Sequence, residues 1–166
     1  KLCVAGGIGL NSVANYQLLR QLNLDDIFVF PAAGDGGIAA GCALWGYAQS
    51  GETRRVRLTR ATLGKAYGVE DCREVIAQFS STIEMEELAP EQMLQRSAEA
   101  LSQGHIVARF EGGCEYGPRA LGHRSILCDP TFERMRDIIN ARVKFREAFR
   151  PFAPVIPAEA AAEVFE

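Results

Sequence analysis

The hydrophobic pattern at the start of the chain alternates short apolar runs with segments of helical spacing. Residues 1–5 and 27–30 are apolar runs of strand length, and a glycine-containing turn follows each of them. Residues 11–22 carry apolar side chains at helical spacing, and a helix of small residues is expected to end near residue 50. Strands that alternate with helices favour an α/β layer with largely parallel pairing.

The pattern changes after residue 50, where an arginine-rich stretch over 51–60 predicts a connection or an edge strand. We place a domain boundary at about residue 60. The apolar spacing beyond it predicts helices over 71–79, 90–102 and 131–143, and strands over 82–88, 105–110 and 125–128. In the last helix, Met135, Ile138 and Ile139 are expected to face inward.

Composition narrows the function classes. The 166 residues are 48% hydrophobic and 23% charged, which is typical of a folded domain, and the net charge of −3 argues against a generally basic nucleic-acid-coating protein. No run approaches a membrane span of roughly 20 apolar residues. The five cysteines lack a C-x-x-C pair, which predicts reduced, mostly buried thiols in a cytoplasmic protein and no structural zinc.

A glycine turn follows the first predicted strand, at Gly6, Gly7 and Gly9. Main-chain N–H groups at such a turn can approach an anion, and the following helix N-terminus favours negative charge. The spacing matches neither common nucleotide-binding pattern. A plain strand-to-helix turn with Asn11 as the N-cap is an equally good interpretation.

Asp35 is the single acid in the loop over residues 31–37, which otherwise contains Gly, Ala and Pro. Ligands of open α/β sheets gather at the carboxyl ends of strands, where this loop lies. A carboxylate there can bind a hard cation or a ribose hydroxyl. The alternative is that Asp35 caps the helix that follows.

Positive charge gathers between residues 105 and 150, where nine Lys and Arg face six Asp and Glu. Arg134, Arg136 and Arg142 are expected to pair with helix neighbours. Arg119, Lys144 and Arg150 instead sit among Gly, Pro and Phe, which favours them as ligands of a phosphate or carboxylate. His123 lies near Arg119, but one histidine without an orienting partner is a weak indication of a general base.

Four phrases carry a family resemblance, in order along the chain: AGGIGLNS at 5–12, PAAGDGG at 31–37, EYGPRALGHRSI at 115–126 and KFREAFRPFAP at 144–154. They resemble the O-carbamoyltransferases related to nodulation protein U and the antibiotic carbamoyltransferases. The resemblance implies a mixed α/β chain made of two partial domains. Residues 1–60 would be the end of an actin-like, sugar-kinase-type domain, and residues 61–166 the start of a YrdC-like domain, so the chain is expected to be a fragment.

The resemblance implies that carbamoyl phosphate and ATP form a carbamoyl adenylate, and that the carbamoyl group passes to a hydroxyl of a sugar or antibiotic. Position by position, it assigns Arg119, Lys144 and Arg150 to the basic catalytic set and Asp35 to a divalent metal of iron or magnesium type. It assigns the nucleotide side to Gly6, Gly7, Asn11, Arg124 and Arg146. The family's H-x-x-x-H metal segment has no counterpart in this sequence.

The resemblance further implies a cytoplasmic enzyme with small-molecule partners, no membrane or nucleic-acid partner, and room for a homodimer. Two other functions remain open. A non-catalytic phosphate- or nucleotide-binding regulatory module would need the cations but not Asp35. A threonylcarbamoyl-adenylate enzyme of RNA modification would share the YrdC-like chemistry.

Overall fold

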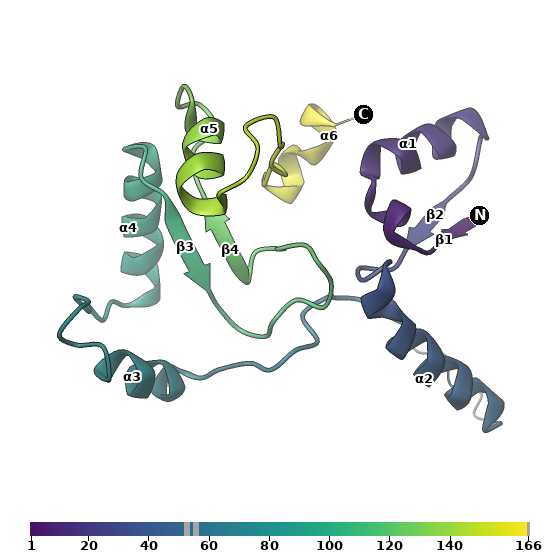
Figure 1. Cartoon of the computed structure of the whole chain (residues 1–166), viewed down its shortest axis with the longest axis horizontal. Helices are drawn as coiled ribbons and strands as arrows, with labels where there is room; N and C mark the ends of the chain where they lie inside the picture. Colours follow the sequence, from purple (N-terminus) through teal and green to yellow (C-terminus); the bar gives the residue numbers. More distant parts are fainter. Residues whose placement is uncertain (52–53, 55–56, 166) are drawn as a thin grey trace. The chain divides into compact units, whose positions relative to one another are not determined.

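A computed structural model describes residues 1–51, 54 and 57–165. Figure 1 labels its α-helices and β-strands. In chain order they are β1 (Leu2–Val4), η1 (Gly7–Leu10), α1 (Ser12–Gln21), β2 (Ile27–Val29), η2 (Asp35–Gly37), α2 (Ile38–Gln49), α3 (Val69–Ala77), α4 (Pro90–Ser102), β3 (Val107–Phe110), β4 (Arg124–Leu127), α5 (Met135–Ile139), η3 (Asn140–Lys144), η4 (Ala158–Ala160) and α6 (Ala161–Val164). The mixed α/β character expected from the sequence is confirmed.

The chain forms two compact units. The first contains Lys1–Glu87 and Ala108–Ser125, and the second contains Leu88–Val107 and Ile126–Glu166. The predicted boundary near residue 60 stays a prediction, and four residues of the stretch around it (52, 53, 55 and 56) lie outside the described residues. The described residues of the stretch 51–60, namely 51, 54 and 57–60, belong to no strand, which agrees with the alternative of a connection and not with an edge strand there.

The first unit begins with the predicted strand–turn–helix–strand–turn–helix order. Strands β1 and β2 pair in parallel, with Leu2 opposite Ile27 and Val4 opposite Val29, as the alternating pattern predicted. The carboxyl ends of the two strands lead into the short helices η1 and η2, which come directly before α1 and α2 in the chain (Figure 1). The two glycine-containing turns therefore lie at the same edge of the two-stranded sheet, where a ligand of an α/β layer is expected.

In the second unit, α4 runs over the residues predicted for it, with Pro90 in its first turn. Gly104 lies just beyond its end with a φ of 81°, a conformation that favours glycine. A Cβ on Gly104 would come within 2.9 Å of the Phe132 ring. Glycine here is required both by backbone conformation and by close packing.

Three expectations for the middle and end of the chain need correction in whole or in part. Residues 82–88 form no strand, because this largely exposed stretch, which contains three glutamates (84, 86 and 87), pairs with no strand in the described structure. The segment predicted as a helix over 131–143 is helical, but its helix begins only at Met135, as α5, and continues as the π-helical turn η3 to Lys144. Met135 and Ile139 are buried as expected, but Ile138 is 37% exposed.

The expectation of mostly buried thiols is also wrong. Cys3 and Cys42 are exposed, and the other three cysteines are half-buried. The buried apolar side chains in the described structure are few, namely Ala32, Ala33, Met135 and Ile139. Within the described residues, no helix has the length and apolar character needed to cross a bilayer.

The close packing at Gly104 leads to a stability prediction. Gly104→Ala should lower the free energy of unfolding by more than about 1 kcal/mol, because alanine is strained at positive φ and would contact Phe132. Gly46→Ala is the matched control: Gly46 lies inside α2 with open space around its Cβ position, so this change should stabilise by about 0.5–1 kcal/mol. Urea unfolding of both variants measures the difference, and equal midpoints would contradict the prediction.

Candidate functional site

The turn after β1 and the loop after β2 contact each other. The Gly6 N–H donates to the Ala33 carbonyl at 2.7 Å, and a Cβ on Gly34 would lie 3.8 Å from the Gly7 Cα. Gly6 has a φ of 96°, so its backbone conformation also favours glycine. The two turns therefore form one continuous surface at the carboxyl edge of β1 and β2.

Asn11 is the N-cap of α1, as one interpretation of the sequence held. Its side-chain oxygen accepts a hydrogen bond from the Ala14 N–H at 3.2 Å. The side chain of Asn15 ties the same turn to the helix, because its amide donates to the Gly9 carbonyl at 2.8 Å. The structural role of Asn11 is thus confirmed, and the nucleotide-binding role of Gly6, Gly7 and Asn11 stays a prediction.

Asp35 lines a cavity of about 460 Å³ in the first unit. The other lining residues are apolar or glycine, including Gly6, Phe30 and Leu44. The alternative that Asp35 caps the following helix is wrong, since neither η2 nor α2 has a side-chain cap hydrogen bond. Asp35 is therefore an exposed carboxylate whose oxygens no described residue engages.

The metal assignment of Asp35 has limited support from its surroundings. Within the described part of the chain, no group of three or more His, Cys, Asp and Glu side chains gathers to hold a metal ion. Asp35 supplies one hard oxygen ligand of the kind that Mg²⁺ or Ca²⁺ prefers. The described residues offer this single ligand and do not complete a cation site around it.

The loop over residues 115–124 docks on this surface. The Tyr116 hydroxyl donates to the Gly36 carbonyl, and the Tyr116 ring meets the Phe30 ring edge-on at 5.8 Å. A Cβ on Gly117 would lie 2.5 Å from the Pro31 carbonyl oxygen, so only glycine allows this approach. Arg119 then reaches the turn after β1, where its guanidinium donates to the Leu10 carbonyl at 3.4 Å.

Glu115 closes the same loop at its base. One carboxylate oxygen accepts main-chain hydrogen bonds from Leu121, His123 and Arg124 at 3.0, 2.8 and 3.1 Å. Burial alone would raise the pKa of Glu115, but the N–H groups of Leu121, Arg124, His123 and Glu115 itself lower it to about 2. The carboxylate is therefore ionised throughout the physiological pH range.

Arg124 anchors the far end of the loop. Its guanidinium donates to the carbonyls of Glu111 at 2.6 Å and Gly112 at 2.9 Å, and it stacks 3.5 Å from the centre of the Phe110 ring. His123 lies beside it, with Nδ1 3.0 Å from the Glu111 carbonyl oxygen. Through these contacts Arg124 helps to fix the end of the loop. Its assigned nucleotide-binding role stays a prediction.

The second unit contains another loop built around one polar side chain. Asn140 is fully buried, and its amide donates to the carbonyls of Ala148 and Arg150 at 3.2 and 3.1 Å. Its side-chain oxygen accepts from Arg146 Nε at 2.8 Å, and the Arg146 guanidinium lies 4.7 Å from the Phe152 ring centre. Arg146 thereby helps to fix the loop over residues 145–152.

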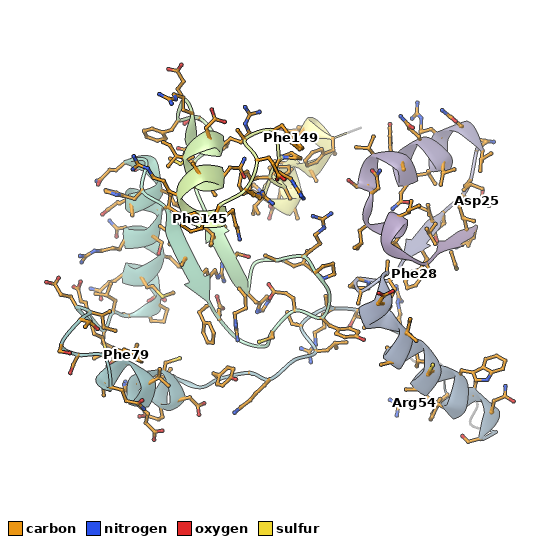
Figure 2. All side chains as sticks on the ribbon, in the orientation of Figure 1. Asp25, Phe28, Arg54, Phe79, Phe145 and Phe149 are labelled. Carbon is orange, nitrogen blue, oxygen red and sulfur yellow. The ribbon has the colours of Figure 1, made fainter. Side chains whose placement is uncertain are left out.

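The exposed side of this second loop carries the other predicted cations. Lys144 is exposed, and Arg150 forms an ion pair with Glu147 at 3.2 Å. The pKa of Glu147 is lowered by its own main-chain hydrogen bond and then by the Arg150 charge. Figure 2 labels the neighbouring aromatic side chains, Phe145 and Phe149, which are 82% and 75% exposed.

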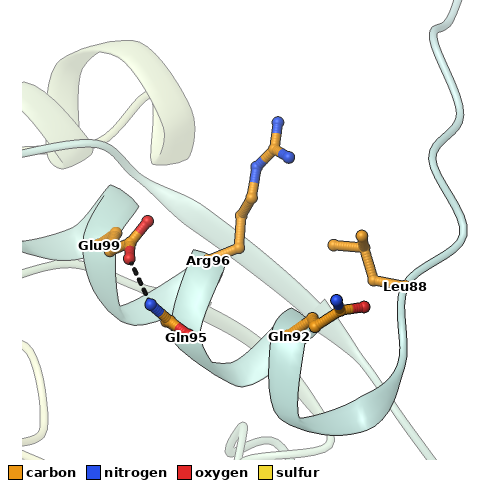
Figure 3. A pocket seen from close by; sticks show the side chains of 5 residues that line it. All are labelled: Leu88, Gln92, Gln95, Arg96 and Glu99. Carbon is orange, nitrogen blue, oxygen red and sulfur yellow. Dashed lines mark hydrogen bonds between the residues drawn. The ribbon is translucent and has the colours of Figure 1, made fainter.

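The structure brings some predicted residues together and leaves others untested. Arg119, Asp35 and the Gly6–Asn11 turn lie in the first unit, whereas Lys144, Arg146 and Arg150 lie in the second. A single pocket formed by Arg119, Lys144 and Arg150 therefore stays a prediction. A smaller cavity of about 230 Å³ along α4 is lined by none of the predicted residues, and its Gln95–Glu99 hydrogen bond is drawn in Figure 3.

Glu115, Tyr116 and Asn140 are the important residues that sequence reasoning missed. Glu115 and Tyr116 begin the glycine- and proline-containing phrase that carries Arg119, so a carboxylate at the base of an irregular loop was a usable signal. Asn140 lies within the segment that the sequence predicted as a helix, and no particular role was expected of it. No sequence signal indicated that a π-helical turn would bury it.

Comparisons with protein families match both ends of the chain. Residues 1–44 match the family described as carbamoyltransferase N-terminus, and residues 98–166 match the carbamoyltransferase C-terminus family. The turn after β1, the loop after β2 and α1 lie within the first match, and both cation-bearing loops lie within the second.

Curated relatives align with nearly the whole chain. Nodulation protein NolO of Bradyrhizobium diazoefficiens is 39% identical over 100% of this chain and 30% of its own length. The 3'-hydroxymethylcephem-O-carbamoyltransferase of Streptomyces clavuligerus is 34% identical over 99% of this chain and 29% of its own length. Nodulation protein U of Azorhizobium caulinodans is 34% identical over 99% of this chain and 27% of its own length. The chain thus spans less than a third of the length of these relatives.

The three hydrogen bonds to Glu115 give a pH-dependent stability prediction. Glu115→Gln keeps an acceptor oxygen but removes its charge, so at pH 7 we expect a loss of about 1–3 kcal/mol in the free energy of unfolding. The pKa of Glu115 in the folded chain, about 2, lies below the ordinary value of 4.5. The stabilisation of the folded state by the carboxylate is therefore complete above pH 4.5, and it declines as the pH falls from 4.5 towards 2.

Urea unfolding of wild type and Glu115→Gln at pH 7 and pH 3 checks this prediction. The difference between the two proteins should narrow at pH 3. Glu133→Gln, a change at an exposed glutamate outside this loop, is the control and should cost less than about 0.5 kcal/mol. A difference that stays constant or widens at pH 3 would show that the carboxylate's charge is not what holds the loop.

Asn140 supports a second prediction. Asn140→Ala removes the amide that donates to two carbonyls and leaves Arg146 Nε without its acceptor, so we expect a loss of about 2–4 kcal/mol in stability. Gln17→Ala, at an exposed amide side chain inside α1, serves as a control for the loss of a side-chain amide. Thermal unfolding measures both variants, and equal melting temperatures would contradict the role of Asn140.

Proposed function

The chain belongs to the carbamoyltransferase family, and on that premise we propose that it forms part of an enzyme that transfers a carbamoyl group to a hydroxyl of a small molecule. One observation carries the proposal beyond family membership. Arg119, from the C-terminal family region, lies against the glycine turn of the N-terminal family region. A hydroxyl of an antibiotic of the cephem type is supported as acceptor by the name of the Streptomyces clavuligerus relative, and a sugar acceptor follows from the resemblance alone.

The proposed donor is carbamoyl phosphate. Water would first cleave carbamoyl phosphate to carbamate and phosphate. A carbamate oxygen would then bond to the α-phosphorus of ATP while the bond from that phosphorus to the pyrophosphate oxygen breaks, which gives a carbamoyl adenylate and pyrophosphate. The acceptor oxygen then bonds to the carbamoyl carbon, the bond from that carbon to the AMP oxygen breaks, and the hydroxyl proton is lost. Such transfers need fixed positive charge near the phosphoryl oxygens and little covalent help from the protein.

The exposed cations of this chain suit that requirement. Arg119 presents a guanidinium that can bind two phosphoryl oxygens at once, and Lys144 and Arg150 add charge from the loop of the second unit. The proposal keeps Asp35 as a ligand for a divalent cation beside the cavity, but no step is assigned to that cation, since the described residues offer a single ligand.

The finer parts of the proposal follow from the resemblance. They are an actin-like, sugar-kinase-type origin for the N-terminal region, a YrdC-like origin for the C-terminal region and a cytoplasmic location. Small molecules are the proposed partners, without nucleic acid or membrane, and a homodimer is compatible with the proposal. The choice of ATP as the nucleotide also follows from the resemblance.

A non-catalytic anion-binding module is the alternative function. It is favoured by one observation, that the described residues hold several cations but no cluster of metal ligands. The two functions differ in outcome: a module would bind carbamoyl phosphate without any transfer to a hydroxyl acceptor, whereas the enzyme containing this chain would release a carbamoylated product.

The proposed anion site gives a binding prediction. The double variant Arg119→Ala, Arg150→Ala should weaken the binding of carbamoyl phosphate at least tenfold, because it removes two charged hydrogen-bond donors. Isothermal titration calorimetry measures both proteins. Arg142→Ala is the matched control, since Arg142 is an exposed arginine that was not assigned to the ligand. Equal binding by wild type and the double variant would refute the site.

A further inference from the structure

The contacts of the Arg119 side chain do little to fix its position. The guanidinium is exposed, and its hydrogen bond to the Leu10 carbonyl is long, at 3.4 Å. An arginine side chain loses up to about 2 kcal/mol of rotamer entropy when it is ordered, which one weak hydrogen bond barely offsets. The position of Arg119 is therefore set mainly by the main chain that carries it.

That main chain is fixed on the side that precedes Arg119. The Tyr116 N–H donates to the Ala61 carbonyl at 2.7 Å, and the Tyr116 side chain contacts Phe30 and the Gly36 carbonyl. Gly117 follows with a φ of 127° and packs against the Pro31 carbonyl. These contacts hold residues 116 and 117 against the loop after β2.

The side that follows Arg119 is held mainly by the Glu115 side chain, which accepts three of its main-chain N–H groups. Its carboxylate accepts the N–H groups of Leu121, His123 and Arg124, so the chain returns to the residue from which the loop started. Ser125 adds one bond further on, where its hydroxyl accepts from the Gly122 N–H at 2.9 Å. Arg119 lies near the middle of the loop that this carboxylate closes.

The same arrangement determines where the charges go. Glu115 accepts main-chain N–H groups, the Arg119 guanidinium donates to the Leu10 carbonyl, and no ion pair between the two side chains occurs in the described structure. The carboxylate is satisfied by dipoles and does not neutralise the nearby guanidinium. The Arg119 charge consequently remains available for an anion.

From this geometry we propose that Glu115 is a positioning residue for Arg119: it closes the 115–124 loop through three main-chain N–H groups and thereby holds the Arg119 guanidinium against the Gly6–Asn11 turn, ready for a phosphoryl anion. The inference rests on the proposed function, because Arg119 is assigned there to carbamoyl phosphate. Glu115 acts through Arg119 and does not contact the anion.

The experiment uses the whole chain and three readouts. Amide hydrogen exchange at residues 121, 123 and 124 reports closure of the loop, the Arg119 Nε–H resonance reports the position of the side chain, and calorimetry with carbamoyl phosphate reports binding. Glu115→Ala should speed exchange at these amides at least tenfold, shift the Arg119 resonance and weaken binding about as much as Arg119→Ala. Glu115→Gln keeps an acceptor oxygen, so it should retain part of each property.

A double-mutant cycle separates positioning from general loss of structure. If Glu115 acts through Arg119, the Glu115→Ala, Arg119→Ala variant binds no more weakly than Arg119→Ala alone. Glu133→Ala is the control and should change none of the readouts. Additive losses, or unchanged exchange and resonance in Glu115→Ala, would overturn the positioning role.

The proposed function can fail separately. If Arg119→Ala binds carbamoyl phosphate as tightly as wild type, the assignment of Arg119 to the ligand is wrong. A shifted Arg119 resonance and faster exchange in Glu115→Ala would in that case still support the positioning of Arg119 by Glu115, and an unshifted resonance would overturn it.

Discussion

Three main-chain N–H groups converge on one carboxylate oxygen of Glu115, and the arrangement of the first unit's candidate site follows from this convergence. The segment between residues 115 and 124 contains two glycines and a proline, so it has no helical or strand ladder to satisfy its backbone. A charged acceptor replaces that ladder at the base of the loop. The chain can then present an arginine on an irregular backbone without losing a defined position.

The second unit solves the same problem with a neutral side chain. Asn140 has both donors and an acceptor, and it uses them to join two carbonyls and the Arg146 guanidinium of the loop that follows. Its complete burial makes these hydrogen bonds more valuable, because an unsatisfied amide would be costly there. Each cation-bearing loop is thus organised by one polar side chain, although few apolar side chains are buried in the described structure.

Local elements were predictable from the sequence where a local signal decides them. The helical spacing of apolar residues correctly predicted α1 and α4. Asn11 is the N-cap of α1 as expected, and the two short apolar runs at the start of the chain form parallel strands. Residues 82–88 gave a false strand, because a short run with alternating apolar residues does not ensure a partner strand. The π-helical turn after α5 and the roles of Glu115 and Asn140 depend on contacts between residues several positions apart, which periodicity does not encode.

The cations chosen from the sequence divide into two physical groups. Arg124 and Arg146 each stack on a phenylalanine and donate to main-chain or amide oxygens, so their hydrogen-bond donors are largely used within the protein. Carbonyl dipoles stabilise a guanidinium but do not cancel its charge, so each anchored arginine still contributes to the local potential.

Arg119 differs because its donors remain mostly exposed while Arg124, in the same loop, supplies a fixed positive charge nearby in the sequence. An anion that binds Arg119 would displace a single long hydrogen bond, to the Leu10 carbonyl, and would leave the contacts of Arg124 in place. Anchoring one arginine and exposing another allows the loop to be rigid and positively charged at once, which a loop of freely solvated arginines would not achieve because ordering each long side chain costs entropy.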